Sequence, residues 1–321
     1  MALPRFVSMT EGVTMQISVM IPTYRRPKDL ERCLEALGEQ LRPADEIIVV
    51  ARREDKDTHD VLKGHAAASL PLRVVIVDLP GLVTAMNLGL EAACGDILAI
   101  TDDDSAPFPD WLQRIERAFE QDESIAGVGG RDLIRQNGTL IDHSVRNVGK
   151  VLWYGKVIAN HHLRLDHVQF VDLLKGVNGA YRLSLLKEIG FDRRLFGRGA
   201  QWHWELSLGL TLRQKGWRLL YDPEIRVNHY PGQLFGDRSR DVYNPEETRN
   251  RCHNEALVLL CYYGIMNRLM FLFWSTLVGT SESYGLVQMM RYLPKEKAQA
   301  VAKFRDNLYG RYMGIRSWLR H

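Results

Sequence analysis

Cysteine is scarce in this chain of 321 residues and is spread along its length. The four cysteines are Cys33, Cys94, Cys252 and Cys261, and no two of them form a CxxC pair. This spacing argues against a zinc knuckle or a dense disulfide framework and favours a reducing compartment. Residues 1–15, which we interpret as a leader, lack the basic start and apolar core of a signal peptide. We therefore expect a cytoplasmic protein.

A strong net charge is also absent, because 42 Lys and Arg residues face 39 Asp and Glu residues. The first 250 residues contain no long Lys/Arg run and no basic stripe interleaved with aromatic residues, so we do not expect nucleic acid as a partner. No internal repeat and no Gly/Ser linker divides the chain. With 45% hydrophobic residues, these features favour one folded catalytic domain followed by a C-terminal appendage.

Short apolar runs alternate with segments of helical periodicity in the first hundred residues. A helix is predicted over residues 84–93, and another over 203–215 that ends at Gly216. Fully apolar strands between helices indicate an α/β fold with a mainly parallel, Rossmann-like sheet covered on both faces. Ligands bind such sheets beyond the carboxyl ends of the strands. The predicted strands are residues 16–22, 46–50, 72–77 and 97–101.

Three consecutive aspartates, Asp102, Asp103 and Asp104, follow the fourth predicted strand. Adjacent carboxylates repel each other, and in a partly buried place their charge must be neutralised or their pKa must rise. A divalent cation removes this conflict, because carboxylate oxygens are ligands that magnesium and manganese prefer. A metal held there would neutralise a departing diphosphate. The alternative is an Asp-rich turn or a helix cap before Pro107.

Four segments around this cluster resemble the family 2 glycosyltransferases, which are inverting enzymes with the glycosyltransferase A fold. The resemblance implies a metal-dependent enzyme, using Mg²⁺ or Mn²⁺, that moves a sugar from a nucleoside diphosphate donor to an acceptor hydroxyl. A UDP-linked donor is the expected form. The order and spacing of the segments, between about residues 16 and 232, carry the likeness. They are SVMIPTYR at 18–25, GLVTAMNLGLEAACGDILAITDDDSAPFPDWL at 81–112, GVNGAYR at 176–182 and ELSLGLTLRQKGWRLLYDPEIRVNHY at 205–230.

The resemblance assigns donor-binding roles at the strand ends. Ala51 replaces the acid that usually follows the second strand, so Glu54 or Asp55 would take its place. Asp102 would face the ribose or a metal-bound water, and Asp103 would contact the nucleotide or brace the loop. The other residues that would bind the donor are Pro22, Thr23, Arg25 and Asn87.

The metal ligands that the resemblance implies are Asp104, Asp102 and His229, where a structural histidine is the alternative for His229. Met86 stands where the family often carries an arginine. We expect phosphate contacts to shift to Arg238 or Arg240, in a loop that could close over the donor.

The general base is the assignment in which this sequence departs most from the family pattern. Inverting transfer needs a group that accepts the proton of the attacking hydroxyl. The Glu-Asp pair that the family usually has before this helix is replaced by the sequence QWHWE at 201–205. Glu205 is then the first candidate and His203 the second, with Trp202 and Trp204 as flat faces for a sugar ring. Alternatively, Glu205 is only a first-turn acid favoured by the helix dipole.

We place the catalytic domain at residues 16–250, with a nucleotide-binding part at 16–130 and an acceptor part at 131–250. Residues 251–321 form the helical appendage. Its segment 256–280 is apolar apart from Asn267 and Arg268, and we interpret it as two short helices, buried or at a membrane interface. Residues 285–321 carry eight Lys/Arg against two acids, which suits an anionic membrane surface. A helical hairpin packed on the core, with a solvated tail, is the alternative.

The leading hypothesis is an enzyme of cell-envelope or extracellular polysaccharide synthesis, with a glycan or lipid-linked acceptor, at the inner face of the plasma membrane. A nucleotidyltransferase would need a Gly-rich loop after the first strand, and residues 22–27 contain no glycine. A non-catalytic scaffold that binds sugar nucleotides is supported only by the missing Glu-Asp pair.

Overall fold

The structure is a computed structural model that describes residues 15–136, 139–231 and 243–320. Residues 1–14 of the predicted leader, Arg238 and Arg240 lie outside the described residues. The strands are β1 (Ile17–Thr23), β2 (Glu46–Arg52), β3 (Leu72–Val77), β4 (Ile97–Ile100), β5 (Ser105–Pro107), β6 (Ile125–Gln136), β7 (Thr139–Leu140), β8 (Lys150–Val151), β9 (Val157–Ile158), β10 (Gln169–Val171), β11 (Gly179–Arg182) and β12 (Arg218–His229). The helices are α1 (Pro27–Gly38), α2 (Lys56–Val61), α3 (His65–Ala68), α4 (Leu82–Ala92), α5 (Trp111–Gln121), α6 (Leu183–Ile189), α7 (Trp204–Gln214), α8 (Pro245–Tyr262), α9 (Ile265–Leu277), α10 (Leu286–Glu296) and α11 (Ala298–Leu319).

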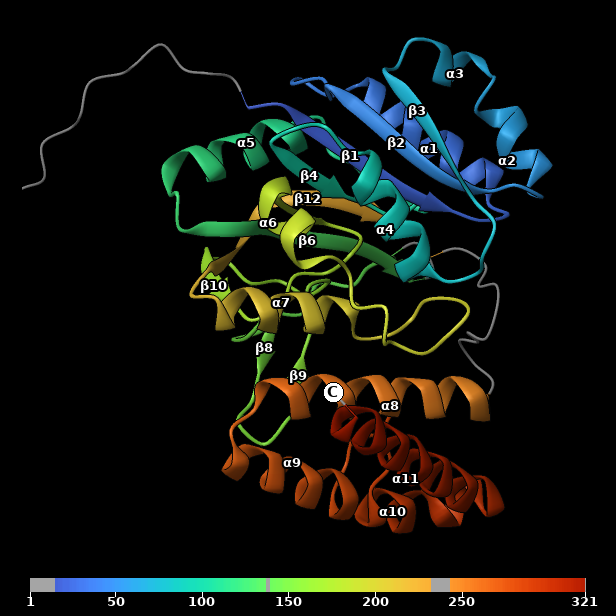
Figure 1. Ribbon diagram of the computed structural model, residues 1–321, viewed down its shortest axis with the longest axis vertical. Coiled ribbons are helices and arrows are strands. Elements are labelled where there is room, and N and C mark those ends of the chain that lie inside the picture. Colours follow the sequence, from blue (N-terminus) through green and yellow to red (C-terminus); the bar gives the residue numbers. More distant parts are fainter. Residues whose placement is uncertain (1–14, 137–138, 232–242, 321) are drawn as a thin grey trace, which may run out of the picture.

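One large sheet crosses the upper part of the molecule, and α8 to α11 form a layer below it (Figure 1). The strand order is β10-β12-β6-β11-β4-β1-β2-β3. Strands β3, β2, β1 and β4 are parallel, as the sequence predicted, whereas β11 runs antiparallel to both β4 and β6. Parallel β1 and β4 end side by side, and this places the turn after β1 next to the three aspartates.

Strands β1, β2 and β4 are buried on both faces, which explains their mainly apolar sequences. The edge strand β3 differs from the prediction, because Arg73 and Val74 are exposed. On one face, Ile17 and Val19 pack into a core with residues of α1 and α5, such as Trp111. On the other face, Met20 packs into a core with residues of α4, such as Met86. Met86 is fully buried in this core.

Helix α7 confirms the prediction for residues 203–215, because it spans Trp204–Gln214. Gly216 follows with φ +87°, a left-handed conformation that glycine adopts without strain. The chain then enters β12, which runs back through the sheet toward the aspartates.

Helix α8 joins the catalytic region to the appendage. It begins at Pro245, with the Asn244 side chain accepting hydrogen bonds from the backbone N–H groups of Glu246 and Glu247. The domain boundary that we placed at residue 250 therefore falls inside a continuous helix. The apolar segment 256–280 contains the end of α8 and all of α9, with a break at Gly264. No described helix combines the length and the hydrophobicity needed to cross a membrane.

Candidate active site

The pairing of β5 with β12 brings the third aspartate beside a histidine from more than a hundred residues downstream. His229 pairs with Ser105 in this short antiparallel ladder, and the backbone N–H of Tyr230 donates to the carbonyl of Asp104 at 2.8 Å. One ligand atom from each of Asp102, Asp104 and His229 lies within 4.8 Å of the others. The structure thus brings together the three residues that the sequence analysis named as metal ligands.

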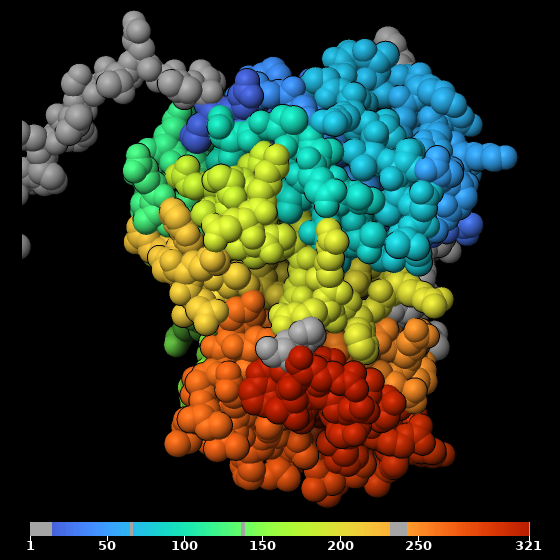
Figure 2. Space-filling view, viewed as in Figure 1, coloured from blue at the N-terminus to red at the C-terminus, as the bar shows by residue number. Residues whose placement is uncertain are grey.

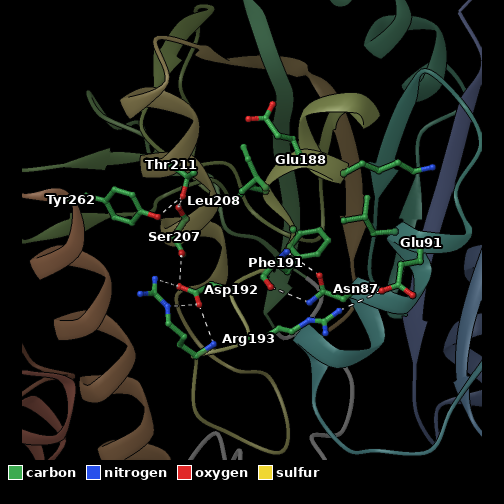
Figure 3. Close-up of a pocket in the computed structure, with 15 residues that line it drawn as sticks. Asn87, Glu91, Glu188, Phe191, Asp192, Arg193, Ser207, Leu208, Thr211 and Tyr262 are labelled. Carbon is green, nitrogen blue, oxygen red and sulfur yellow. Dashed lines mark hydrogen bonds and ion pairs between the residues drawn. The ribbon is translucent and has the colours of Figure 1, made fainter. Parts of the chain in front are cut away.

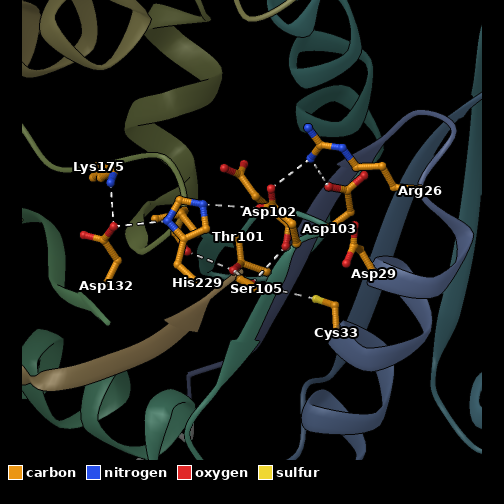
Figure 4. Close-up of polar contacts among 12 residues, drawn as sticks. Arg26, Asp29, Cys33, Thr101, Asp102, Asp103, Ser105, Asp132, Lys175 and His229 are labelled. Atoms are coloured by element: carbon orange, nitrogen blue, oxygen red, sulfur yellow. Dashed lines mark hydrogen bonds and ion pairs between the residues drawn. The ribbon is translucent and has the colours of Figure 1, made fainter. Parts of the chain in front are cut away.

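A buried ion pair fixes the orientation of His229 (Figure 4). Its Nδ1 lies 3.2 Å from Oδ2 of Asp132, and the ammonium group of Lys175 lies 2.5 Å from the same oxygen. Its Nε2 lies 3.4 Å from Oδ1 of Asp104. With Nδ1 engaged by a carboxylate, Nε2 is the nitrogen that faces the aspartates, which is the arrangement found behind metal-binding histidines.

The charge of Asp132 is maintained by its two partners. Burial would raise the pKa of this carboxyl, but the positive charge of Lys175 and the hydrogen bond with His229 hold the pKa well below its usual range. Burial would likewise lower the pKa of His229, and the hydrogen bonds with Asp104 and Asp132 raise it instead. The sequence analysis missed Asp132 and Lys175, because neither belongs to a local motif that signals a ligand.

Arg26, at the start of α1, lies against the other side of the cluster. Its guanidinium group contacts Oδ1 of Asp103 at 2.7 Å and Oδ2 of Asp104 at 3.1 Å. The Thr23 hydroxyl donates to Oδ2 of Asp103 at 2.8 Å. Burial raises the pKa of Asp103 to about 7, with Arg26 opposing this rise and Asp104 adding to it. Asp103 was expected either to contact the nucleotide or to brace the loop, and these contacts favour the second role.

The donor atoms of the cluster fit a bound cation. Asp102, Asp104 and His229 bring two carboxylates and one imidazole within 4.8 Å of one another. Two carboxylates and an imidazole form a donor set that a divalent metal accepts.

A cavity of about 520 Å³ adjoins the aspartates. Pro22, Thr23, Arg25, Asp102 and Asp103 line it, as the sequence analysis expected. Three further arginines line the same cavity, namely Arg26, Arg52 and Arg198. A pocket with four guanidinium groups beside a carboxylate cluster suits a phosphorylated ligand that brings its own cation.

Asp55, in contrast, supports the cavity wall from behind. Its buried carboxylate accepts hydrogen bonds from the backbone N–H of Arg25 at 2.5 Å and from the Thr58 hydroxyl at 2.7 Å. Arg25 has φ +56°, a strained conformation for a residue with a side chain. Asp55 therefore holds Arg25 in place, whereas Glu54 pairs at the surface with Arg52 at 2.8 Å.

Asn87 does not join the residues that line this cavity. Its amide nitrogen donates to the carbonyls of Val83 and Phe191, and its oxygen accepts from the N–H of Phe191. The side chain faces a different cavity of about 780 Å³, shown in Figure 3, together with residues of α6 and α7. These hydrogen bonds connect α4 to the segment after α6, so the side chain has a structural role.

Glu205 lies in the first turn of α7 and is half-buried. Burial raises the pKa of its carboxyl, and the negative charge of Asp102 adds to the rise, while a hydrogen bond from the backbone of Gly176 opposes it. Glu205 therefore interacts electrostatically with Asp102. A carboxylate with a raised pKa fits the general-base role.

His203 precedes α7 in a left-handed conformation with φ +72°. Burial, and then the charge of Arg251, lower its pKa to about 3, so that its imidazole is a weak base. Trp204 is buried, and its ring packs against Gly176 and Phe191, which excludes the sugar-platform role that we expected for it. Trp202 stays partly exposed.

The segment between α6 and α7 carries Arg198 and leads into Glu205, and α8 holds it in place. Asn254, fully buried on α8, accepts a hydrogen bond from the N–H of Phe196 at 2.7 Å. Its amide nitrogen donates to the carbonyls of Phe196 and Trp202. The appendage therefore holds the segment that carries Arg198, which sequence patterns did not indicate.

The Asp132 contact yields a first prediction. We expect Asp132→Asn to weaken Mn²⁺ binding by about 10- to 100-fold, because a neutral amide no longer fixes His229 as a carboxylate does. Titration of the protein with Mn²⁺, followed by the paramagnetic signal of the free ion, measures this change. Asp142→Asn is the matched control, since Asp142 pairs with Arg131 and Arg164. Equal Mn²⁺ affinity in the Asp132 variant and the control would contradict the assignment.

Solved structures of other proteins share this architecture. A mannosyltransferase from Pyrobaculum calidifontis, in complex with GDP-Man and Mn²⁺, superimposes with a TM-score of 0.57 at 16% identity over 99% of this chain and 88% of its own. TarS of S. aureus, in complex with UDP-GlcNAc, gives 0.59 at 17% identity over 95% and 89%. The fold is that of the glycosyltransferases of the A type, with a helical region at the C-terminus.

Sequence comparison is more specific. Residues 18–188 match the family described as Glycosyl transferase family 2. The chain belongs to this family and is a glycosyltransferase. It is 25% identical to the glycosyltransferase AglE of Haloferax volcanii over 69% of this chain and 68% of the relative. It is 28% identical to chondroitin synthase of Escherichia coli over 62% of this chain, but over only 32% of that longer protein.

Proposed function

We propose that this protein is an inverting, metal-dependent glycosyltransferase that uses a nucleoside diphosphate sugar. The observation that carries the proposal is the arginine-lined cavity beside the cluster of Asp102, Asp104 and His229. The cavity would hold the nucleotide, and the cluster would face the diphosphate. A divalent cation at this place would neutralise the departing diphosphate.

The residues of the chain divide the work between donor and acceptor. Asp102, Asp104 and His229 would hold the cation, and the arginines of the cavity would bind the phosphates. Glu205 would accept the proton of the acceptor hydroxyl while its oxygen attacks the anomeric carbon from the face opposite the diphosphate. Because Glu205 is absent from the lining of the donor cavity, donor binding and base catalysis use separate groups.

For the cation we favour Mn²⁺ over Mg²⁺. Magnesium is bound almost entirely through oxygen, whereas the cluster offers one imidazole nitrogen. Two structural neighbours, the mannosyltransferase and GalNAc-T7, were solved with Mn²⁺. A UDP sugar is the proposed donor, since TarS was solved with UDP-GlcNAc and GalNAc-T7 with UDP.

The proposed acceptor is a glycan or a lipid-linked sugar of the cell envelope or of an extracellular polysaccharide. The relatives include a glucosyl-dolichyl phosphate glucuronosyltransferase of Haloferax volcanii and an amylovoran biosynthesis glycosyltransferase of Erwinia amylovora. A protein with such an acceptor would work at the inner face of the plasma membrane.

A panel of sugar nucleotides tests the proposal. Binding of each donor is measured with and without Mn²⁺, and release of nucleoside diphosphate is measured with glycan and lipid-linked acceptors. We expect one UDP sugar to bind at least tenfold more tightly with Mn²⁺ and to be turned over. Failure of every donor to bind in the presence of Mn²⁺ would overturn the proposal, and tight binding without any turnover would support the scaffold alternative.

A further inference from the structure

Helix α9 presents a row of large apolar side chains to solvent. Phe271 and Ser275 on the opposite face are buried, so the helix is fixed to the body by that face alone. The exposed residues recur every three or four positions, which places them on one side of the helix. They are Ile265, Met266, Leu269, Phe273 and Leu277, with exposed fractions between 37% and 68%.

Helix α10 extends this surface. None of its residues, all of which are described, is buried. Helices α9 and α10 touch each other, and both lie at the end of the molecule opposite α2 and α3 (Figures 1 and 2). We call the two rows together the α9–α10 apolar face. On α10 its residues are Leu286, Val287, Met290 and Leu293, with exposed fractions between 37% and 53%.

Exposed cations border the α9–α10 apolar face. Arg291 and Lys295 lie on α10, and Lys297 follows it. Glu296, the acid among them, is engaged by Lys303 at 2.8 Å and by the Tyr284 hydroxyl at 3.0 Å. A second copy of the chain on this face would bring like charges together. An anionic lipid surface offers an apolar interior and negative headgroups at once.

The hairpin formed by β8 and β9 reaches the same end of the molecule (Figure 1). Tyr154 at its tip packs on Trp274 of α9, with ring centroids 4.9 Å apart. Its neighbour Trp153 is 58% exposed. Tryptophan concentrates at the boundary between membrane and water, and an exposed tryptophan beside α9 is therefore a further feature that suits a bilayer surface.

We propose that the α9–α10 apolar face docks the protein on an anionic bilayer, with both helices lying in the interface. The helices have 13 and 11 residues, fewer than the roughly 20 that a spanning helix needs. Docking does not depend on sugar transfer, so it can be tested apart from the enzymatic activity. Helix α8 connects this surface to the segment between α6 and α7, which carries Arg198 and leads into Glu205. Docking would therefore orient the active site relative to the membrane.

Sedimentation of the full chain with vesicles tests this inference. Vesicles of phosphatidylcholine alone are compared with vesicles that also contain phosphatidylglycerol. We expect binding at least tenfold stronger to the anionic vesicles, which weakens as salt is added. Met266→Gln combined with Phe273→Gln is expected to reduce this binding at least tenfold. Arg291→Gln combined with Lys295→Gln is expected to remove the preference for anionic lipid.

The control variant carries Leu41→Gln and Val168→Gln, two exposed apolar residues outside the appendage. It should bind vesicles as the unmodified chain does, and thermal unfolding followed by circular dichroism shows that all variants are folded. The proposal is overturned if the chain ignores anionic vesicles, or if the α9 variant binds them as the control does. It is also overturned if the α9 substitutions instead convert a dimer into a monomer in sedimentation velocity.

Discussion

Asp104→Ala is expected to abolish the strengthening of donor binding by Mn²⁺ and to lower the transfer rate by about 10³-fold, or about 4 kcal/mol. The Asp104 side chain is buried. It contacts Arg26 on one side and His229, another member of the cluster, on the other. No neighbouring carboxylate can replace it, because Asp103 is already held by Arg26 and Thr23. Donor affinity with and without Mn²⁺, together with the transfer rate, gives the measurement.

A matched control separates loss of the metal from loss of the fold. Asp110→Ala removes a carboxylate that pairs with Arg114 near the start of α5, and it should leave Mn²⁺ dependence unchanged. Asp104→Asn keeps the size of the side chain and should fail as the alanine variant does, since a neutral amide is a poor ligand. Donor binding that still strengthens with Mn²⁺ in both Asp104 variants would show that the cation is held elsewhere.

The first part of the sheet could be predicted from the sequence because its signals are local. Buried strands β1, β2 and β4 are mainly apolar runs, and polar residues of the site stand at or just after their ends. Thr23 at the end of β1 and Asp102 after β4 come together because parallel strands end at one edge of the sheet. His229 was found through the family resemblance, and the β5–β12 ladder explains why it lies beside Asp104.

Residues whose role depends on contacts between distant parts of the chain could not be identified from local sequence motifs. Asp132 reaches His229 because β6 and β12 run parallel, although 97 residues separate the two in sequence. Asn254 reaches Phe196 across 58 residues. Conversely, Asp55 and Asn87 stand where donor ligands were expected, but their side chains satisfy backbone groups of the chain itself. A sequence motif fixes the place of such a residue better than the direction of its side chain.

Composition alone could not decide between the two interpretations of residues 256–280, because one half of the segment is buried and the other is exposed. Leu257 and Leu260 on α8 are buried in the body, whereas Leu269 and Phe273 on α9 are exposed. The two halves are similarly apolar, and only the break at Gly264 separates them. Which half is covered depends on the packing of α8 against α7 and α11.

Glu205→Gln is expected to lower the transfer rate by about 10²- to 10⁴-fold while leaving donor affinity unchanged. The amide keeps the shape of the side chain but cannot accept the proton of the acceptor hydroxyl. Donor affinity should survive because Glu205 does not belong to the lining of the donor cavity. Transfer rate and donor dissociation constant, measured on the same preparation, separate the two effects.

The pH profile provides an independent measurement of the same role. Burial raises the pKa of Glu205 above the ordinary value for a glutamate, so the active carboxylate form is lost early as the pH falls. We expect the rate of the unmodified protein to decline on the acid side already above pH 4.5, the ordinary value. The part of this decline that Glu205 causes should be lost in Glu205→Gln, while the part that Asp103 causes remains. The His203→Gln variant should show the same decline as the unmodified protein, because the pKa of His203 is lowered to about 3 and His203 titrates at a lower pH. If the decline disappears in His203→Gln instead, or if Glu205→Gln turns over normally, then the base is not Glu205.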